Sequence, residues 1–295
     1  MEEYIVDKYK EYEKKEIQSG YRCKTFLLTN KKNKLIYQVY IGYTEYQAKK
    51  KEYITKLIKE NTDIYQIPEV FECAQTEKFS YLVSEYKNGI EIEKINKNIF
   101  DYRVFYQDLS NILTNIHSVN IGDSFGWVNE SGVEKRESFA DYIEQEIKRN
   151  INRIKLIIGE KKEILDYIEE KANKALLKIT KINSVKPVIC WYDINSNNIL
   201  INSKSEITGF LDPGGARFSP KEWDLAFIKM DLCKSKKEFQ YFIKEYEKKQ
   251  KINKDLLEAL SVIVEIDDIA FQVESNTKLP IAFESNFKDI ISKIV

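Results

Sequence analysis

Apolar and polar positions along the first 88 residues form short runs that are typical of a small sheet. Four strand-like runs occupy residues 21–29, 35–41, 67–70 and 80–84. The first two flank a polar turn and predict a hairpin. Residues 45–61 instead carry apolar residues at helical spacing, and the expected inner positions are Tyr46, Tyr53, Ile54, Leu57 and Ile58. The pattern predicts a small sheet with one helix packed against it.

The pattern changes near residues 87–89, which divides the chain into residues 1–88 and 89–295. Long amphipathic helices are expected at residues 100–117, 138–158 and 161–182. A short β-rich stretch follows, and the remainder from Glu222 onward is helical in character. We therefore predict an α+β, two-lobed fold, with a small antiparallel sheet in the first lobe and a larger, mainly helical second lobe.

Composition narrows the range of functions. With 43% hydrophobic residues, the 295-residue chain can bury one large core or two lobes. Lys+Arg and Asp+Glu are balanced at 47 each, which argues against a nucleic-acid or membrane partner. The charged N-terminus lacks the apolar stretch of a signal peptide, and the four cysteines form no C-x-x-C pair. A cytoplasmic protein with free thiols is expected, and its oligomeric state is left open.

The most informative residues lie in the β-rich stretch. Asp193 is followed five residues later by Asn198 and an apolar run, and Asp212 ends the next apolar run. Such residues often cap turns, but here they occur in order, between strands, and before Asp224. Phosphoryl transfer needs one carboxylate to accept a proton from the attacking hydroxyl, and an Asn and a second Asp to hold Mg²⁺. The stretch therefore indicates a phosphotransferase.

At this point the chain resembles the aminoglycoside phosphotransferase and choline kinase family, whose members have a protein-kinase-like fold. The resemblance implies five strands in the small lobe. The resemblance is specific in the segments W-Y-D-I-N-S-N-N-I-L, F-L-D-P-G-G-A and E-W-D-L-A, and looser elsewhere. It implies that Asp193 is the catalytic base, that Asn198 and Asp212 bind Mg²⁺, and that Asp224 is a buried brace. It further implies ATP or GTP as the phosphoryl donor and a small hydroxyl-bearing molecule as the acceptor.

The resemblance also implies a set of nucleotide-binding residues. They comprise a covering turn, a strand position, a helix carboxylate and an interlobe strand: Gly20, Tyr21, Lys24, Gln38, Glu52, Ser84, Glu85 and Tyr86. Two positions depart from the family. Gln38 stands where the family has a strand Lys or Arg, and Trp191 stands where it has His. Lys24 or Arg22 could supply the missing charge.

These departures keep a second function open, namely a binding protein without turnover. A protein kinase is less attractive, because Asp224 follows Asp212 within a dozen residues and leaves no room for a long activation segment. The acceptor could be an aminoglycoside-like antibiotic, a choline-like alcohol or a sugar derivative.

Two further groups of residues bear on the acceptor, and the single histidine is weighed beside them. Four acids in the last third are either a solvated helix face or a site for a cationic acceptor: Glu265, Asp267, Asp268 and Glu274. Trp191, Tyr192 and Trp223 could form an aromatic box for a quaternary ammonium group. The single histidine, His117, ends an apolar helical run and is expected to be a packed, hydrogen-bonded core residue.

Overall fold

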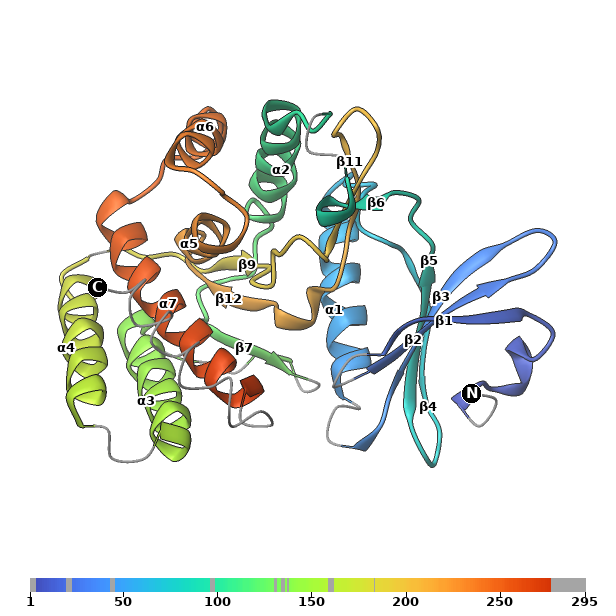
Figure 1. Ribbon diagram of the computed structural model, residues 1–295, viewed down its shortest axis with the longest axis horizontal. Coiled ribbons are helices and arrows are strands. Elements are labelled where there is room, and N and C mark those ends of the chain that lie inside the picture. Colours follow the sequence, from blue (N-terminus) through green and yellow to red (C-terminus); the bar gives the residue numbers. More distant parts are fainter. Residues whose placement is uncertain are drawn as a thin grey trace.

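An antiparallel sheet forms the N-terminal part of the computed structural model, which describes residues 4–19, 23–42, 46–95, 99–129, 132–133, 136, 138–158, 162–182 and 184–276 (Figure 1). Its strands are β1 (Glu13–Ser19), β2 (Cys23–Thr29), β3 (Lys34–Tyr40), β4 (Val70–Gln75) and β5 (Ser80–Glu85). They lie in the order β1-β2-β3-β5-β4, and all neighbours are antiparallel. The predicted five-stranded lobe is therefore confirmed.

One face of this sheet buries alternate apolar residues of β2, β3 and β5, including Phe26, Leu28 and Tyr37. Tyr37 stacks on Tyr81 with ring centroids 5.2 Å apart. Two details differ from the prediction. The strand expected at residues 67–70 begins only at Val70, and the charged strand β1 was not predicted. An edge strand such as β1 needs backbone pairing more than an apolar face, so its sequence carries little periodic signal.

Helix α1 (Tyr46–Asn61) lies between the sheet and the rest of the molecule (Figure 1). Ile54 and Ile58 are fully buried, as predicted. Tyr46 and Tyr53 are 38% and 42% exposed, so their assignment to the inner face was wrong. The buried face is rotated and includes Lys51 instead.

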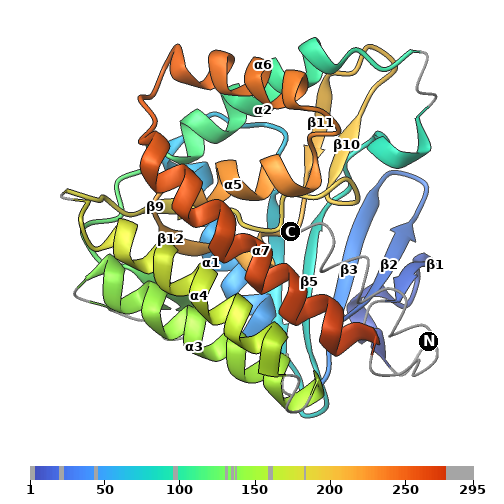
Figure 2. The same ribbon diagram turned by 60° about the vertical axis from the view of Figure 1, so that its left-hand side comes forward.

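The C-terminal part is mainly helical, as predicted. Its helices are α2 (Tyr102–Ile116), α3 (Phe139–Ile158), α4 (Lys162–Ile179), α5 (Glu222–Asp231), α6 (Lys236–Glu247) and α7 (Lys254–Asn276). Helices α3, α4 and α7 pack side by side, and α2 packs against α6 (Figure 2). Among the helices that the structure describes, none is long and apolar enough to cross a membrane.

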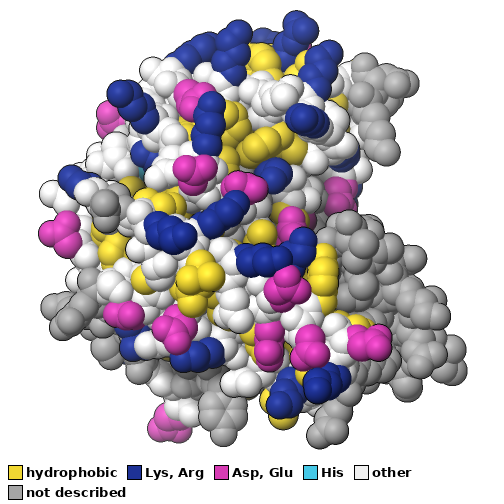
Figure 3. Space-filling model, turned by 90° about the vertical axis from the view of Figure 1, so that its left-hand side faces the viewer, with side chains coloured by type: hydrophobic (Ala, Val, Ile, Leu, Met, Phe, Trp, Pro, Cys, Tyr) yellow, Lys and Arg dark blue, Asp and Glu magenta, His cyan; other side chains and the backbone are white. Residues whose placement is uncertain are grey.

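The outer surface of the helical part carries both signs of charge. Figure 3 shows basic and acidic side chains interspersed with hydrophobic ones over one face. This mixed surface agrees with the balanced charge of the sequence. All four cysteines are free thiols, as predicted.

Two small sheets carry the β-rich stretch. One contains β6 (Ile90–Glu91), β10 (Ile199–Ile201) and β11 (Ile207–Phe210) in the order β11-β10-β6. The other contains β7 (Gly126–Asn129), β8 (Gly132–Val133), β9 (Val188–Cys190) and β12 (Arg217–Ser219) in the order β8-β7-β12-β9. The loop from β9 to β10 carries Asp193, and the loop from β11 to β12 carries Asp212. The two sheets thereby bring these loops together.

The chain passes from the N-terminal sheet into the helical part beside the β10–β11 hairpin. Here β6 pairs with β10, and Gly89 lies directly against the hairpin. A Cβ at Gly89 would lie 2.4 Å from Thr208 Oγ1 and 2.7 Å from Leu200 Cβ. Glycine is therefore required by close packing at this crossing.

Candidate active site

Asp193 is presented by a tight turn that follows β9. Tyr192 has a φ of 72°, in the left-handed region. The backbone N–H of Asp193 donates to the carbonyl of Trp191 at 3.0 Å, and that of Ile194 donates to the carbonyl of Tyr192 at 2.9 Å. Such a turn is strained for a residue other than glycine, and strain of this kind is found mainly where the surrounding structure enforces it.

Asp224 on α5 stabilises this turn through hydrogen bonds. Its two carboxylate oxygens accept the backbone N–H groups of Trp191 and Tyr192, each at 2.8 Å. Asp224 also lies 3.1 Å from His117 Nε2, and His117 Nδ1 lies 2.6 Å from the Tyr246 hydroxyl. All of these side chains are buried. The structure therefore confirms Asp224 as a brace and His117 as a hydrogen-bonded core residue.

Cys190 lies close enough to His117 and Asp224 for the three to resemble a metal-binding group. The Cys190 thiol, however, donates to the carbonyls of Ser219 and Pro220 at 3.3 and 3.2 Å. The other two side chains have the partners given above. We therefore interpret the group as a satisfied buried hydrogen-bond network.

Trp191, which replaces the family histidine, keeps a bracing contact. Its indole N–H donates to the carbonyl of Leu211 at 3.0 Å, and its ring packs on Phe210. This bond ties the loop of Asp193 to the segment that carries Asp212. The departure at position 191 therefore leaves the two loops connected.

The Asp193 carboxylate is held at both oxygens. Asn195 Nδ2 donates to Oδ1 at 2.6 Å, and Asn198 Nδ2 donates to Oδ2 at 3.1 Å. Burial and the nearby Asp212 carboxylate raise the pKa of Asp193, against the lowering effect of these two amides. A raised pKa strengthens a carboxylate as a base. Asn195 was not predicted as a site residue, because its spacing equally suits a turn cap.

Asp212 lies beside Asn198, because the N–H of Leu211 donates to the Asn198 carbonyl at 2.8 Å. Its backbone is left-handed, with φ 59° and ψ 73°, and its Oδ1 accepts the N–H of Gly214 at 3.0 Å. Burial alone would raise the pKa of Asp212, but Lys51 and the Gly214 N–H lower it below its ordinary value. Asp212 is therefore an anion in the folded protein.

The donor atoms suit a hard divalent cation. Asn198 Nδ2 donates to both the carbonyl and the carboxylate of Asp193, which leaves the amide oxygen as its ligating atom. The hydrogen bonds in the described part of the chain engage Oδ1 of Asp212 and not Oδ2. Carboxylate and amide oxygens are the ligands that Mg²⁺ prefers, so these two residues fit the ion.

Lys51 is a further residue that the sequence reasoning missed. Its Nζ lies 2.9 Å from Asp212 Oδ1 and 3.5 Å from Gln38 Oε1. Burial would lower the pKa of Lys51, but the Asp212 carboxylate raises it above its ordinary value. The sequence signal that could have identified Lys51 is its helical spacing from Ile54 and Ile58, which places it on the same face of the helix.

Glu52, the predicted helix partner of the strand, binds Lys56 at 2.8 Å instead. Strand β3 carries Gln38 in place of a cation, and the contact from α1 to this residue is made by Lys51. A helix turns by roughly 100° per residue, so neighbouring positions face different partners. This one-residue offset cannot be read from the sequence pattern.

The other nucleotide-binding predictions stay predictions. Gly20 and Tyr21 lie outside the described residues, as does Arg22. Lys24 Nζ lies 4.4 Å from the centroid of the Tyr4 ring. Ser84 is buried in β5.

At the interlobe strand, the backbone N–H of Glu85 donates to the Glu69 carbonyl at 2.9 Å. Lys34 Nζ lies 5.4 Å from the centroid of the Tyr86 ring. These contacts fix the strand where it leaves the sheet. They do not test its role in binding a nucleotide base.

Of the four predicted acids near the C-terminus, Asp268 lies near Asp231, whose carboxylate also feels the charge of Asp193. Although Asp231 is exposed, partial desolvation of its carboxylate, followed by the charges of Asp193, Asp268 and Glu93, raises the pKa of Asp231 to about 6. These carboxylates come from the loop between β9 and β10, α7, a short helix (Ile92–Lys94) and α5. Asp231 and Glu93 were not predicted.

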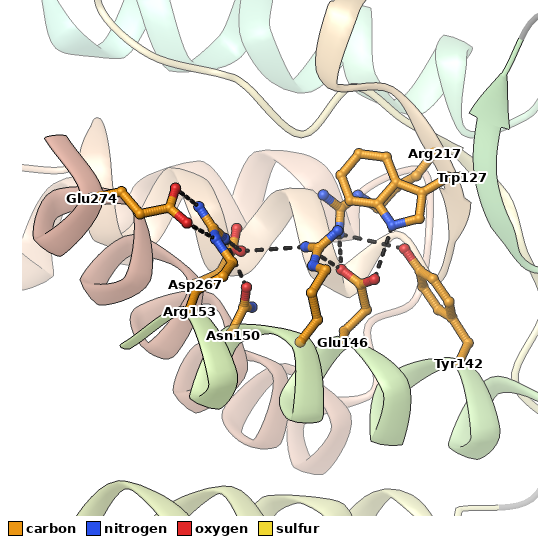
Figure 4. Close-up of polar contacts among 9 residues, drawn as sticks. Trp127, Tyr142, Glu146, Asn150, Arg153, Arg217, Asp267 and Glu274 are labelled. Carbon is orange, nitrogen blue, oxygen red and sulfur yellow. Dashed lines mark hydrogen bonds and ion pairs between the residues drawn. The ribbon is translucent and has the colours of Figure 1, made fainter. Parts of the chain in front are cut away.

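The other three acids interact with basic side chains. Glu274 binds Arg153 at 2.6 Å, and Asp267 lies 3.4 Å from Arg153 and 3.6 Å from Arg149 (Figure 4). Partial desolvation raises the pKa of Glu265, which is exposed, and the charges of Lys229 and Lys171 act in the opposite direction. These contacts fix α7 against neighbouring helices.

The aromatic residues form a box, but a side chain of the protein itself fills it. The guanidinium carbon of Arg217 lies 3.6 Å from the Tyr192 ring centroid, 3.8 Å from that of Trp127 and 4.7 Å from that of Trp223. Arg217 is fully buried and reaches Glu146 at 3.4 Å (Figure 4). The prediction of a ligand-binding box was therefore wrong: Arg217 supplies the cation, and Trp191 packs elsewhere.

The sheet, the helical part and the paired loops between them define a kinase-like phosphotransferase fold. A model of the phosphotransferase enzyme family matches residues 14–253. The chain therefore belongs to this family, which confirms the resemblance. A comparison with curated protein sequences found no match.

Solved structures agree on the fold. A thermostable mutant of aminoglycoside phosphotransferase APH(4)-Ia, in a ternary complex with AMP-PNP and hygromycin B, has a TM-score of 0.75 at 15% identity and covers 98% of this chain and 93% of its own. A putative fructosamine-3-kinase from Haemophilus somnus 129PT has 0.68 at 15%, covering 96% and 91%. Spectinomycin phosphotransferase APH(9)-Ia, with ADP and spectinomycin, has 0.64 at 17%, covering 95% and 88%. At these identities the likeness concerns the fold.

Proposed function

We propose that this protein transfers the γ-phosphoryl group of ATP or GTP to a hydroxyl of a small, amine-bearing molecule. The observation that carries the proposal is the assembly of Asp193, Asn198 and Asp212 on two loops that are hydrogen-bonded to each other. The family match supports phosphoryl transfer, and the structural relatives that bind AMP-PNP or ADP support a nucleotide donor.

In this proposal Asp193 accepts the proton of the acceptor hydroxyl as its oxygen attacks the γ-phosphorus. Asn195 and Asn198 hold the carboxylate in place, and its raised pKa favours proton transfer. Asn198 and Asp212 would hold Mg²⁺, which neutralises charge on the phosphates when bound. The main contribution of the chain is positioning, which suits the loose transition state of phosphoryl transfer.

The preference for an amine-bearing acceptor rests on the carboxylates around Asp231, one of which is Asp193. Asp231 and Asp268 lie close enough to influence each other's charge, and Asp193 acts on Asp231 as well. A cationic group would relieve their mutual repulsion. The relatives named above bind or are named for hygromycin B, spectinomycin and fructosamines, so they do not single out one acceptor.

The first test is metal-dependent nucleotide binding by calorimetry. We expect ATP or GTP to bind in the presence of Mg²⁺ and to lose this dependence in Asp212→Asn. Asp255→Asn, an exposed acid at the start of α7, is the matched control and should behave as the wild type. Absence of binding by the wild type with either nucleotide would sink the proposal.

The second test is turnover with hygromycin B, spectinomycin, choline and a fructosamine as acceptors. Asp193→Asn should keep nucleotide binding and lose roughly 10²- to 10⁴-fold in kcat, the usual contribution of a general base. If the wild type binds nucleotide but phosphorylates none of these, and Asp193→Asn matches it in phosphate release, the binding protein without turnover becomes the better description.

A further inference from the structure

We infer that Lys51 on α1 is the cation that binds the nucleotide phosphates in this protein, in place of a cation on strand β3. The inference rests on the proposed function and assigns a residue to it. Its first basis is location: Nζ of Lys51 lies 2.9 Å from Asp212 Oδ1. Phosphates held with a metal ion at Asp212 would lie next to this ammonium group.

Burial sets Lys51 apart from a surface lysine. Its side chain is only 6% exposed, and its Nζ lies 5.2 Å from the centroid of the Tyr40 ring. Lysine is rarely this buried unless it is paired. Its partner is an acid on the opposite part of the molecule, 161 positions further along the chain, rather than a neighbour on its own helix.

The loop after Asp212 leaves space for this lysine. A Cβ at Gly214 would lie 3.1 Å from Lys51 Cε and 2.7 Å from Asp212 Oδ1. Gly214 is not among the glycines with positive φ, so its backbone conformation does not require glycine. The close approach of the lysine stem and the carboxylate explains the residue instead.

Gln38 on strand β3 contacts the ammonium group of Lys51. Its Oε1 accepts the Tyr40 hydroxyl at 3.1 Å and lies 3.5 Å from Lys51 Nζ. The amide therefore presents its oxygen to the ammonium group. A lysine at position 38 would place a second positive charge at that distance, so Gln38 and Lys51 suit each other.

A lysine can bind either the Asp212 carboxylate or the nucleotide phosphates, because its ammonium group sits on a flexible four-carbon stem and has three hydrogen-bond donors. In the nucleotide-free protein it neutralises Asp212. Once a divalent cation occupies the Asp212 carboxylate, the ammonium can turn to the phosphate oxygens with little movement of its stem. The alternative role is purely structural, in which Lys51 only stabilises Asp212 and never contacts nucleotide.

Binding measurements on substituted proteins separate these roles. Lys51→Gln should weaken Mg²⁺–ATP or Mg²⁺–GTP binding about 10- to 100-fold, as expected for a charged hydrogen bond. Adding Gln38→Lys to this variant should restore most of the affinity, because the charge returns to the same place from the strand. Lys56→Gln, an exposed lysine on the same helix, should have no effect.

Unchanged affinity in Lys51→Gln would overturn the inference, and so would a loss that Gln38→Lys leaves uncorrected in a folded protein. The proposed function fails separately, through absence of nucleotide binding by the wild type. Labelling of the wild type provides a test that no substitution can disturb. A fluorosulfonylbenzoyl ester of adenosine carries its electrophile where the phosphates would lie. It should modify Lys51, located by peptide mass spectrometry, and modification of other lysines alone would overturn the inference.

Discussion

Two residues at the site, Tyr192 and Asp212, hold left-handed backbones that residues other than glycine rarely adopt. Each such conformation costs on the order of 1–3 kcal/mol. The offsetting contacts are specific: Asp224 binds the N–H of Tyr192, and Gly214 and Lys51 bind the carboxylate of Asp212. At the scale of the residue, these contacts hold the strained backbones in place and so fix the directions in which the side chains of Asp193 and Asp212 point.

The raised pKa of Asp231 leads to a pH prediction. With a pKa of about 6, Asp231 is mostly neutral at pH 5 and negative at pH 7. A cationic acceptor should therefore bind roughly 2- to 5-fold more tightly at pH 7 than at pH 5, which is the range of an accessible ion pair. Calorimetry of acceptor binding across this range, on the wild type and Asp231→Asn, measures the effect.

The substitution should flatten this pH profile, and a neutral acceptor should show no such profile in either protein. Asp193, Asp268 and Glu93 face the same group and act on its charge. Comparison with Asp231→Asn separates its titration from theirs. An identical pH profile in the variant would assign the effect to one of these other carboxylates.

At the scale of the element, the crossing beside the β10–β11 hairpin fixes how the sheet meets the helical part. Strand β6 pairs with β10, so the segment after the interlobe strand is held by the same hairpin that begins at Asn198. The N–H of Phe210 on β11 also donates to the carbonyl of Gln66 at 3.0 Å. The hairpin thus joins the two loops of the site to both parts of the molecule.

Gly89→Ala tests how tightly this crossing is packed. The added methyl group would lie within 2.7 Å of Thr208 Oγ1 and Leu200 Cβ, so we expect a loss of about 1–3 kcal/mol in the free energy of unfolding. Urea denaturation measures this loss. Adding Thr208→Ala removes the closest contact and should recover part of the stability. A Gly89→Ala protein as stable as the wild type would show that the residues around the crossing shift to accommodate the methyl group.

At the scale of the molecule, the two lobes share a core. Ile54, Ile58, Ile64 and Ile67 pack in one cluster with Trp191 and with residues of α2, α5 and α6. The sheet has its own apolar cluster on its other side. The N-terminal region therefore contributes its helix to the core of the helical part.

This shared core predicts a single cooperative unfolding transition, because neither lobe can lose its structure without exposing the common cluster. Scanning calorimetry should give equal calorimetric and van't Hoff enthalpies. Two resolved transitions would mean that the sheet unfolds independently and that the shared cluster contributes little coupling.

The fold and the candidate positions Asp193, Asn198 and Asp212 could be identified in the sequence because their signals are local. Helical and strand periodicity lies within each element, and Asp193, Asn198 and Asp212 lie within a single stretch of chain. Lys51 and Asp231 could not be assigned, because their roles depend on the rotation of α1 and on the arrangement of α5 and α7. The same dependence on tertiary packing explains why Tyr46 and Tyr53 face outward and why Arg217 fills the aromatic box.

His117 is the only histidine in the chain, and it contacts the carboxylate that holds the turn before Asp193. The protein therefore contains a native spectroscopic reporter. Its imidazole would give one isolated set of resonances in a magnetic resonance spectrum, with no neighbouring histidine to confuse it. Changes in the loop that carries Asp193 could be followed through that one signal, without labels or engineered probes.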